Sequence, residues 1–154
     1  MRRISFLLFT IILSFTAYTS NVNAKLTEEA VIQTITNDFI KSHKIQVDGY
    51  NYISNMEFTP DKDNLTAEQK SLSNILLKIA KSQIGGDWSP VFYLNKENKN
   101  GYVLEKKLSG INNLYSLSFD DEKQNWNITN KINKNGTDLV DLGLLQSANE
   151  FKKG

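Results

Sequence analysis

Two segments in the first half of the chain repeat apolar residues at helical spacing. The first begins at Thr27, whose side chain is suited to capping a helix, and two glutamates follow it. Its last residues, His43 and Lys44, are basic and suit the negative end of the helix dipole. The sequence therefore predicts a helix over this segment, with an apolar stripe formed by Val31, Ile32, Ile35 and Phe39.

The second helical segment opens with a capping box, in which Thr66 caps and Gln69 reaches back to it. Gly85 and Gly86 are expected to end this helix directly after Ile84. The apolar residues again recur on one side, as in a helix that packs against a core. They are Leu72, Ile75, Leu76 and Ile79.

The residues between the two helices leave two interpretations open. Asp48 and Gly49 predict a turn. The residues after it place apolar side chains at even spacing, which fits a strand and an extended arm equally well. These side chains are Tyr50, Tyr52, Met56 and Phe58.

The second half of the chain changes to a period of two, the pattern of half-buried strands. Short strands are expected at 91–94 and 102–108, separated by a polar turn. A third strand alternates apolar residues with serines, and its apolar positions are Tyr115, Leu117 and Phe119.

A return strand is expected from Trp126, after a hairpin loop at 120–125. Asn135 and Gly136 form a strong turn signal. Residues 139–147 fit either a last strand or a short helix. Two helices followed by an antiparallel meander predict an α+β fold, in which a curved sheet wraps the helices.

The first residues, 1–24, have the order of a Sec-type secretory signal peptide. A positive start at Arg2 and Arg3 precedes an apolar stretch, and small residues precede a cleavage site after Ala24. The apolar stretch is shorter than the roughly 20 residues of a transmembrane helix. We therefore expect residues 25–154 to be a single globular domain in the periplasm or secreted, with no stable membrane insertion after cleavage.

Composition narrows the chemistry that this domain can perform. The chain has 18 Lys and Arg, 17 Asp and Glu, and a formal net charge of +1. Removing Arg2 and Arg3 with the signal leaves −1, which gives no reason to expect nucleic-acid binding. The absence of Cys excludes thiol nucleophiles, disulfides and Cys-based zinc sites, and a single His excludes sites with two His ligands. We predict no cofactor and no metal site.

Three groups in the sequence are candidates for catalysis or metal binding, and each has a simpler interpretation. Asp61 and Asp63 begin like a calcium loop, but the later EF-hand ligands and glycine are missing. His43 is the only imidazole, and no Gly-x-Ser-x-Gly motif supplies a nucleophile for it. The acidic cluster 120–122 lies in a predicted hairpin loop, where charge is usually solvated. We therefore predict that the protein is not an enzyme.

The stretch 85–93 is the most informative part of the sequence. It leaves a helix, turns at two glycines and a proline, and carries three aromatic residues into a strand. Asp87, Trp88 and Tyr93 are our candidates for partner binding, because Trp and Tyr are typical anchors of protein interfaces. Alternatively, Trp88 covers the mouth of the core, a role that suits amphipathic aromatic residues equally well.

The order of these features resembles a group of small exported bacterial proteins with a cystatin-like or nuclear-transport-factor-like cone, in which a curved sheet wraps a helix. The matching pieces are the helix segment 72–76, the Gly-Asp-aromatic-x-Pro turn at 86–92, and Trp126 to Ile128 at the end of the meander. Some members of this group are periplasmic immunity proteins that block cell-wall amidases delivered by type VI secretion. The resemblance implies an inhibitor role, with a peptidoglycan amidase effector as the partner.

We expect an exported, non-enzymatic binding protein, namely an inhibitor or immunity protein that neutralises a cell-wall-degrading effector enzyme. The alternative is a small-ligand carrier with a pocket between the helices and the sheet. In a carrier, Tyr93, Tyr115, Phe119 and Trp126 would line that pocket. A hydrolase is a third hypothesis, and it requires two carboxylates that face each other across a cleft.

Overall fold

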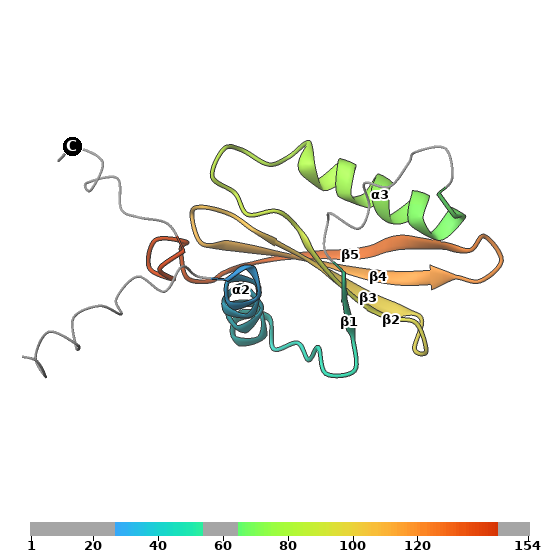
Figure 1. The fold of residues 1–154 in the computed structure, drawn as a ribbon, viewed down its shortest axis with the longest axis horizontal. Helices are drawn as coiled ribbons and strands as arrows, with labels where there is room; N and C mark the ends of the chain where they lie inside the picture. Colours follow the sequence, from blue (N-terminus) through green and yellow to red (C-terminus); the bar gives the residue numbers. More distant parts are fainter. Residues whose placement is uncertain (1–26, 54–64, 145–154) are drawn as a thin grey trace, which may run out of the picture. The chain divides into compact units, whose positions relative to one another are not determined.

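The computed structural model describes residues 27–53 and 65–144, in which two helices accompany one antiparallel sheet (Figure 1). This confirms the predicted α+β class. By its contacts the chain divides into two units, residues 1–30 and 31–154, and the sheet belongs to the second. In chain order the elements are α2 (Glu28–His43), β1 (Asn51–Ile53), α3 (Ala67–Ala80), β2 (Val91–Asn95), β3 (Asn100–Lys106), β4 (Ile111–Asp120) and β5 (Asn125–Asn135).

Both helices begin where the sequence predicts. The Ala30 N–H donates to Thr27 Oγ1 over 3.2 Å at the start of α2, and this helix ends at His43 as expected. At the start of α3 the capping box is complete: the Gln69 N–H donates to Thr66 Oγ1, and the Thr66 N–H donates to Gln69 Oε1. Local side-chain chemistry fixes both starts, so no information from the rest of the chain is needed to place them.

The end predicted for α3 is wrong by about one turn. The helix stops at Ala80, not at Ile84. The Ile84 N–H donates to Asp87 Oδ2 over 2.9 Å, so it is not available to continue the helical hydrogen-bond ladder. The Ile84 side chain is 71% exposed, so a further turn would gain no burial at this position.

The sheet has the simple order β1-β2-β3-β4-β5, with each strand antiparallel to its neighbour. The segment that was open to two interpretations forms a strand at 51–53, while Met56 and Phe58 lie outside the described residues. A strand therefore separates the two helices in sequence, and α3 belongs to the connection between β1 and β2. The prediction of two successive helices before the sheet is corrected to this extent.

The two helices lie on opposite faces of the sheet (Figure 1). Successive residues of a strand point to opposite faces, and β2 shows this directly. Phe92 and Leu94 pack with the apolar stripe of α3, whereas Val91 and Tyr93 pack with that of α2. The expectation from the sequence that the sheet wraps both helices is therefore corrected, because the helices do not lie on one side of it. A sheet covered on both faces explains why four consecutive apolar residues of β2 are all buried.

The segment after β5 is neither the strand nor the short helix that the sequence left open. Residues 139–143 form turns, held by backbone bonds such as Leu142 N–H to Asp138 O and Leu144 N–H to Leu139 O. Leu139 is fully buried and anchors this segment. Residues 145–147 lie outside the described part of the chain. Of the helices in the described ranges, none combines the length and hydrophobicity needed to cross a membrane.

Candidate functional site

Asp87 fixes the loop between α3 and β2. Its carboxylate accepts the N–H of Ile84 at 2.9 Å and the N–H of Leu108 at 3.0 Å, and it forms an ion pair with Lys107 Nζ at 2.9 Å. Burial alone would raise the pKa of Asp87, but these three donors outweigh it and hold the pKa below its ordinary value. The Asp87 side chain is 1% exposed, so its role in the free chain is to hold the loop.

A chain of polar contacts continues from this loop into the sheet. Lys107 Nζ also lies 2.7 Å from Glu105 Oε1, and Glu105 Oε2 accepts from Tyr115 Oη at 2.7 Å and from Asn113 Nδ2 at 2.8 Å. Burial raises the pKa of Tyr115, and the hydrogen bond to Glu105 raises it further, so its hydroxyl stays protonated and donates. The ring of Tyr115 and the loop of Asp87 are thereby connected through Lys107.

Two pockets open above this chain of contacts, and both are lined by Ser82. One, of about 470 Å³, lies between the loop and the β3–β4 turn, and its apolar lining comes from Ile84, Leu108 and Ile111. The other, of about 290 Å³, is lined by Lys78 and Ile79 of α3, Tyr115 of β4, and Ile128 and Lys131 of β5. Because the pockets share Ser82, they adjoin, and we call the two together the Ser82 surface.

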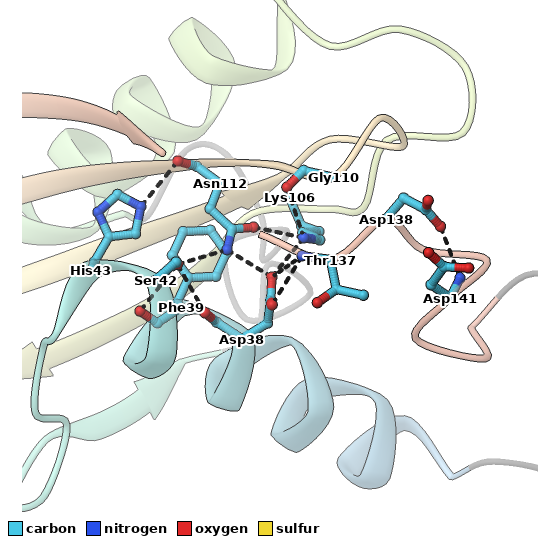
Figure 2. Close-up of polar contacts among 10 residues, drawn as sticks. All are labelled: Asp38, Phe39, Ser42, His43, Lys106, Gly110, Asn112, Thr137, Asp138 and Asp141. Carbon is cyan, nitrogen blue, oxygen red and sulfur yellow. Dashed lines mark hydrogen bonds and ion pairs between the residues drawn. The ribbon is translucent and has the colours of Figure 1, made fainter. Parts of the chain in front are cut away.

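A second polar cluster lies on the opposite face of the sheet, beneath α2 (Figure 2). Lys106 is fully buried, and its ammonium donates to Asp38 Oδ2 at 2.7 Å, Asn112 Oδ1 at 2.8 Å and Gly110 O at 3.1 Å. Asp38 also accepts from Asn112 Nδ2 at 2.7 Å and from the Thr137 N–H at 3.1 Å. All three ammonium hydrogens of Lys106 have acceptors, so this cluster serves to join α2 to the sheet rather than to offer a reactive group.

His43 lies at the edge of this cluster, as Figure 2 shows. Its Nε2 is 3.1 Å from Asn112 O, and because a carbonyl only accepts, Nε2 carries the hydrogen. Its Nδ1 is buried and has no hydrogen-bond partner among the described residues. The ring stacks on Phe39 with centroids 5.5 Å apart. Burial lowers the pKa of His43, and the charge of Lys134 lowers it further; the hydrogen bond that His43 donates to Asn112 O and the charge of Asp38 oppose this shift.

We expect the stability of the protein to fall once the pH drops below the ordinary histidine pKa of 6.5. Below that value the unfolded chain binds a proton at His43 more readily than the folded chain, so protonation favours unfolding. Replacing His43 by glutamine keeps a donor for Asn112 and removes the titration. Thermal unfolding between about pH 7.5 and 5 should therefore show a smaller loss of stability in His43→Gln than in the wild type.

An equal loss of stability in both proteins over this pH range would contradict the assignment of this pH dependence to His43.

The buried carboxylates affect the stability over a different, lower range of pH. The pKa values of Asp38, Asp87 and Glu105 are lowered in the folded chain, so the stability that they contribute is present above their ordinary values of 3.8 and 4.5. It is lost only when the pH falls through the lowered values.

The structure does not bring the three predicted partner-binding residues together on one exposed surface: Trp88 and Tyr93 share the apolar cluster on the α2 face, and the Asp87 side chain pairs with Lys107. Asp87 is buried in the loop contacts described above. Trp88 is half-buried and packs against the apolar residues that α2 and the sheet bury between them; its backbone N–H donates to Lys106 O, and its backbone carbonyl accepts from Gln83 Nε2. Tyr93 is buried on the α2 face, where its hydroxyl is 2.8 Å from Thr36 Oγ1. Direct contact with a partner stays a prediction for each of them.

The other candidates from the sequence are distributed as follows. Asp61 and Asp63 lie outside the described residues. Glu68, which follows them in the sequence, pairs with Lys96 and accepts from the Trp126 indole. Asp120 accepts the N–H groups of the hairpin turn that follows it. Within the ranges 27–53 and 65–144, no group of three or more His, Asp and Glu side chains is placed to hold a metal ion.

The comparisons with known proteins return no relatives. No protein-family model matches the chain, and no curated protein or solved structure matches it either. The comparisons therefore carry no argument about function, which has to be inferred from the sequence and the geometry of this chain.

Sequence reasoning missed Ile84, Glu105 and Lys107. Glu105, Lys106 and Lys107 stand together in the segment 102–108, which was predicted as a strand and whose other residues are apolar, and this was the available signal. A charged run inside a buried strand requires partners on both faces of the sheet. Those partners come from distant parts of the chain, and a single sequence does not identify them.

Proposed function

We propose that the protein is an exported binding protein and that the Ser82 surface contacts its protein partner. The observation that carries the proposal is Ile84: a large aliphatic side chain, 71% exposed, on a loop that Asp87 holds by two backbone hydrogen bonds and an ion pair. A fixed loop loses little conformational entropy on binding, and exposed apolar surface next to polar residues is typical of interaction sites.

The identity of the partner rests on the sequence. Residues 1–24 support export, and the resemblance to small exported immunity proteins with a cystatin-like cone supports an inhibitor role. We therefore propose a periplasmic protein that binds and neutralises a cell-wall-degrading enzyme, such as a peptidoglycan amidase. In this proposal the protein inhibits a catalyst and performs no catalysis itself.

The alternative of a small-ligand carrier is supported by the pocket of about 470 Å³, a volume typical of ligand sites. Its position differs from the one expected for a carrier, because it lies beside the α3–β2 loop rather than between a helix and the sheet. Of the four aromatic residues proposed to line a carrier pocket, Tyr115 lines the smaller pocket. Phe119 and Trp126 pack against each other, with ring centroids 5.1 Å apart.

A photo-cross-linking amino acid at position 84 tests the proposal in the organism that produces the protein. We expect one protein to be cross-linked through position 84, and we expect deletion of the gene to sensitise cells to the enzyme so identified. Position 140 provides a matched control, because Val140 is also an exposed aliphatic residue, 41% exposed, and does not line the Ser82 surface. Cross-linking to no protein, or equally from both positions, together with no sensitivity, would refute the proposal.

A further inference from the structure

The two halves of the Ser82 surface differ in chemistry. The half between the loop and the β3–β4 turn presents aliphatic side chains, of which Ile84 is the most exposed. The half between α3 and β5 has an apolar floor of Ile79 and Ile128 and is flanked by two exposed lysines, Lys78 and Lys131. A ligand that spans both halves therefore meets an aliphatic site and a basic site side by side.

A β-bulge builds the basic half. The register between β4 and β5 shifts at Ser116 and Leu117, so that Leu117 pairs with Ile128 whereas Ser116 pairs with Asn130. In a regular strand, Ile128 and Lys131 would point to opposite faces, because they are three positions apart and side chains alternate between the faces. The extra residue brings both onto the α3 face, where they line the same pocket.

The two lysines keep their charge available for a ligand. Within the described part of the chain, neither Lys78 nor Lys131 forms an ion pair. Lys131 Nζ lies 4.9 Å from the centroid of the Tyr115 ring, whose hydroxyl is held by Glu105. The nearby carboxylates of Asp87 and Glu105 are buried and are paired with Lys107. The neighbouring Tyr115 ring thus positions Lys131, and the buried carboxylates of Asp87 and Glu105 do not neutralise the charge of the basic half.

We propose that the Ser82 surface binds an extended segment of the partner protein in which an acidic side chain stands close to an aliphatic one. The carboxylate lies between Lys78 and Lys131, and the aliphatic side chain packs against Ile84, Leu108 and Ile111. Charge complementarity selects the acidic residue, and the apolar lining selects its aliphatic neighbour. This inference rests on the proposed function, because it assumes that the occupant belongs to a protein.

Synthetic peptides test this chemistry without knowledge of the partner. The probe is a blocked peptide in which one serine separates each glutamate from the next leucine, so that both side chains lie on the same side of an extended chain, and its controls replace every glutamate by glutamine or every leucine by serine. Binding is followed by NMR on isotope-labelled protein purified after export, through the methyl groups of Ile84, Ile111 and Ile128. We expect the glutamate–leucine peptide to shift all three methyl signals and to bind at least about tenfold more tightly than either control peptide.

Charge reversal supplies the matched variants. Lys78→Glu combined with Lys131→Glu should weaken binding of the glutamate–leucine peptide by about tenfold or more, and should allow a lysine–leucine peptide to bind instead. Lys70→Glu changes an exposed lysine of α3 that lines neither pocket, and it should leave binding unchanged. All variants lie at exposed positions, and thermal unfolding checks that they remain folded.

The outcomes separate this inference from the proposed function. If a partner is cross-linked through position 84 but charge reversal leaves peptide binding unchanged, the inference is overturned and the proposed function stands. Shifts confined to Ile128, without Ile84 or Ile111, would indicate a site for a free anion and would also overturn it. If neither cross-linking nor peptide binding is seen, both proposals fail.

Discussion

Replacing Lys106 by methionine is expected to lower the free energy of unfolding by about 3–5 kcal/mol, as measured by urea denaturation. The side chain is fully buried, and its ammonium is the positive partner of Asp38 beneath α2. Methionine has similar length and no charge, so it fills the space but leaves the Asp38 carboxylate without its counter-ion. An unpaired charge in the interior is costly, whereas the intact pair itself contributes little net stability.

A second substitution makes this result diagnostic. Asp38→Asn in the Lys106→Met background removes the stranded charge and still provides an oxygen for Asn112 and Thr137. The double variant should therefore be more stable than Lys106→Met alone. If the double variant is equally or less stable, the loss comes from packing and not from the buried charge. A loss below about 1 kcal/mol in Lys106→Met would show that the carboxylate is solvated, contrary to its burial here.

Gly136→Ala is expected to cost about 2–3 kcal/mol in the same measurement, the upper part of the range for overpacking a core. A Cβ at this position would overlap Asp38 Oδ2 and Asn112 Nδ2, and it would lie 2.8 Å from Asn112 Cγ. These atoms are hydrogen-bonded to each other, so neither moves aside without breaking the cluster under α2. Gly136 was predicted from sequence as a turn residue, and the structure gives it this closer packing role.

Gly85→Ala provides the control for this effect. A Cβ at position 85 meets no atom within 4 Å, and the loop there is exposed. Replacing glycine by alanine at an unstrained position reduces the freedom of the unfolded chain, so we expect a change between zero and a stabilisation of about 1 kcal/mol. If both variants lose the same stability, the cost at position 136 does not come from the cluster under α2.

The elements that sequence reasoning located correctly depend on local signals. The capping box of Thr66 and Gln69 involves residues three positions apart, and the alternation of Tyr115, Leu117 and Phe119 lies within one strand. The end of α3 was misplaced because the glycines at 85 and 86 dominated the prediction, whereas the Asp87 carboxylate removes the N–H of Ile84 from the helix.

The placement of the helices on opposite faces was available in part from the sequence. Four consecutive apolar residues in β2 indicate a strand buried on both sides. This signal argues against an arrangement in which both helices lie on the same face of the sheet. The candidate site was harder to predict from the sequence. The loop around Asp87 was singled out for its aromatic residues, but its exposed apolar residue is Ile84. Two of the groups that hold the loop, the Lys107 ammonium and the Leu108 N–H, lie about 20 positions further along the chain.

The hydrogen bond that the Thr137 N–H donates to Asp38 has a consequence for the kinetics of folding. These residues are 99 positions apart, so their contact closes almost the whole described chain. We expect such a contact to form after the strands between them are in place, so that the charges of Asp38 and Lys106 stay hydrated until then. We therefore expect changes in the cluster under α2 to alter the rate of unfolding far more than the rate of folding.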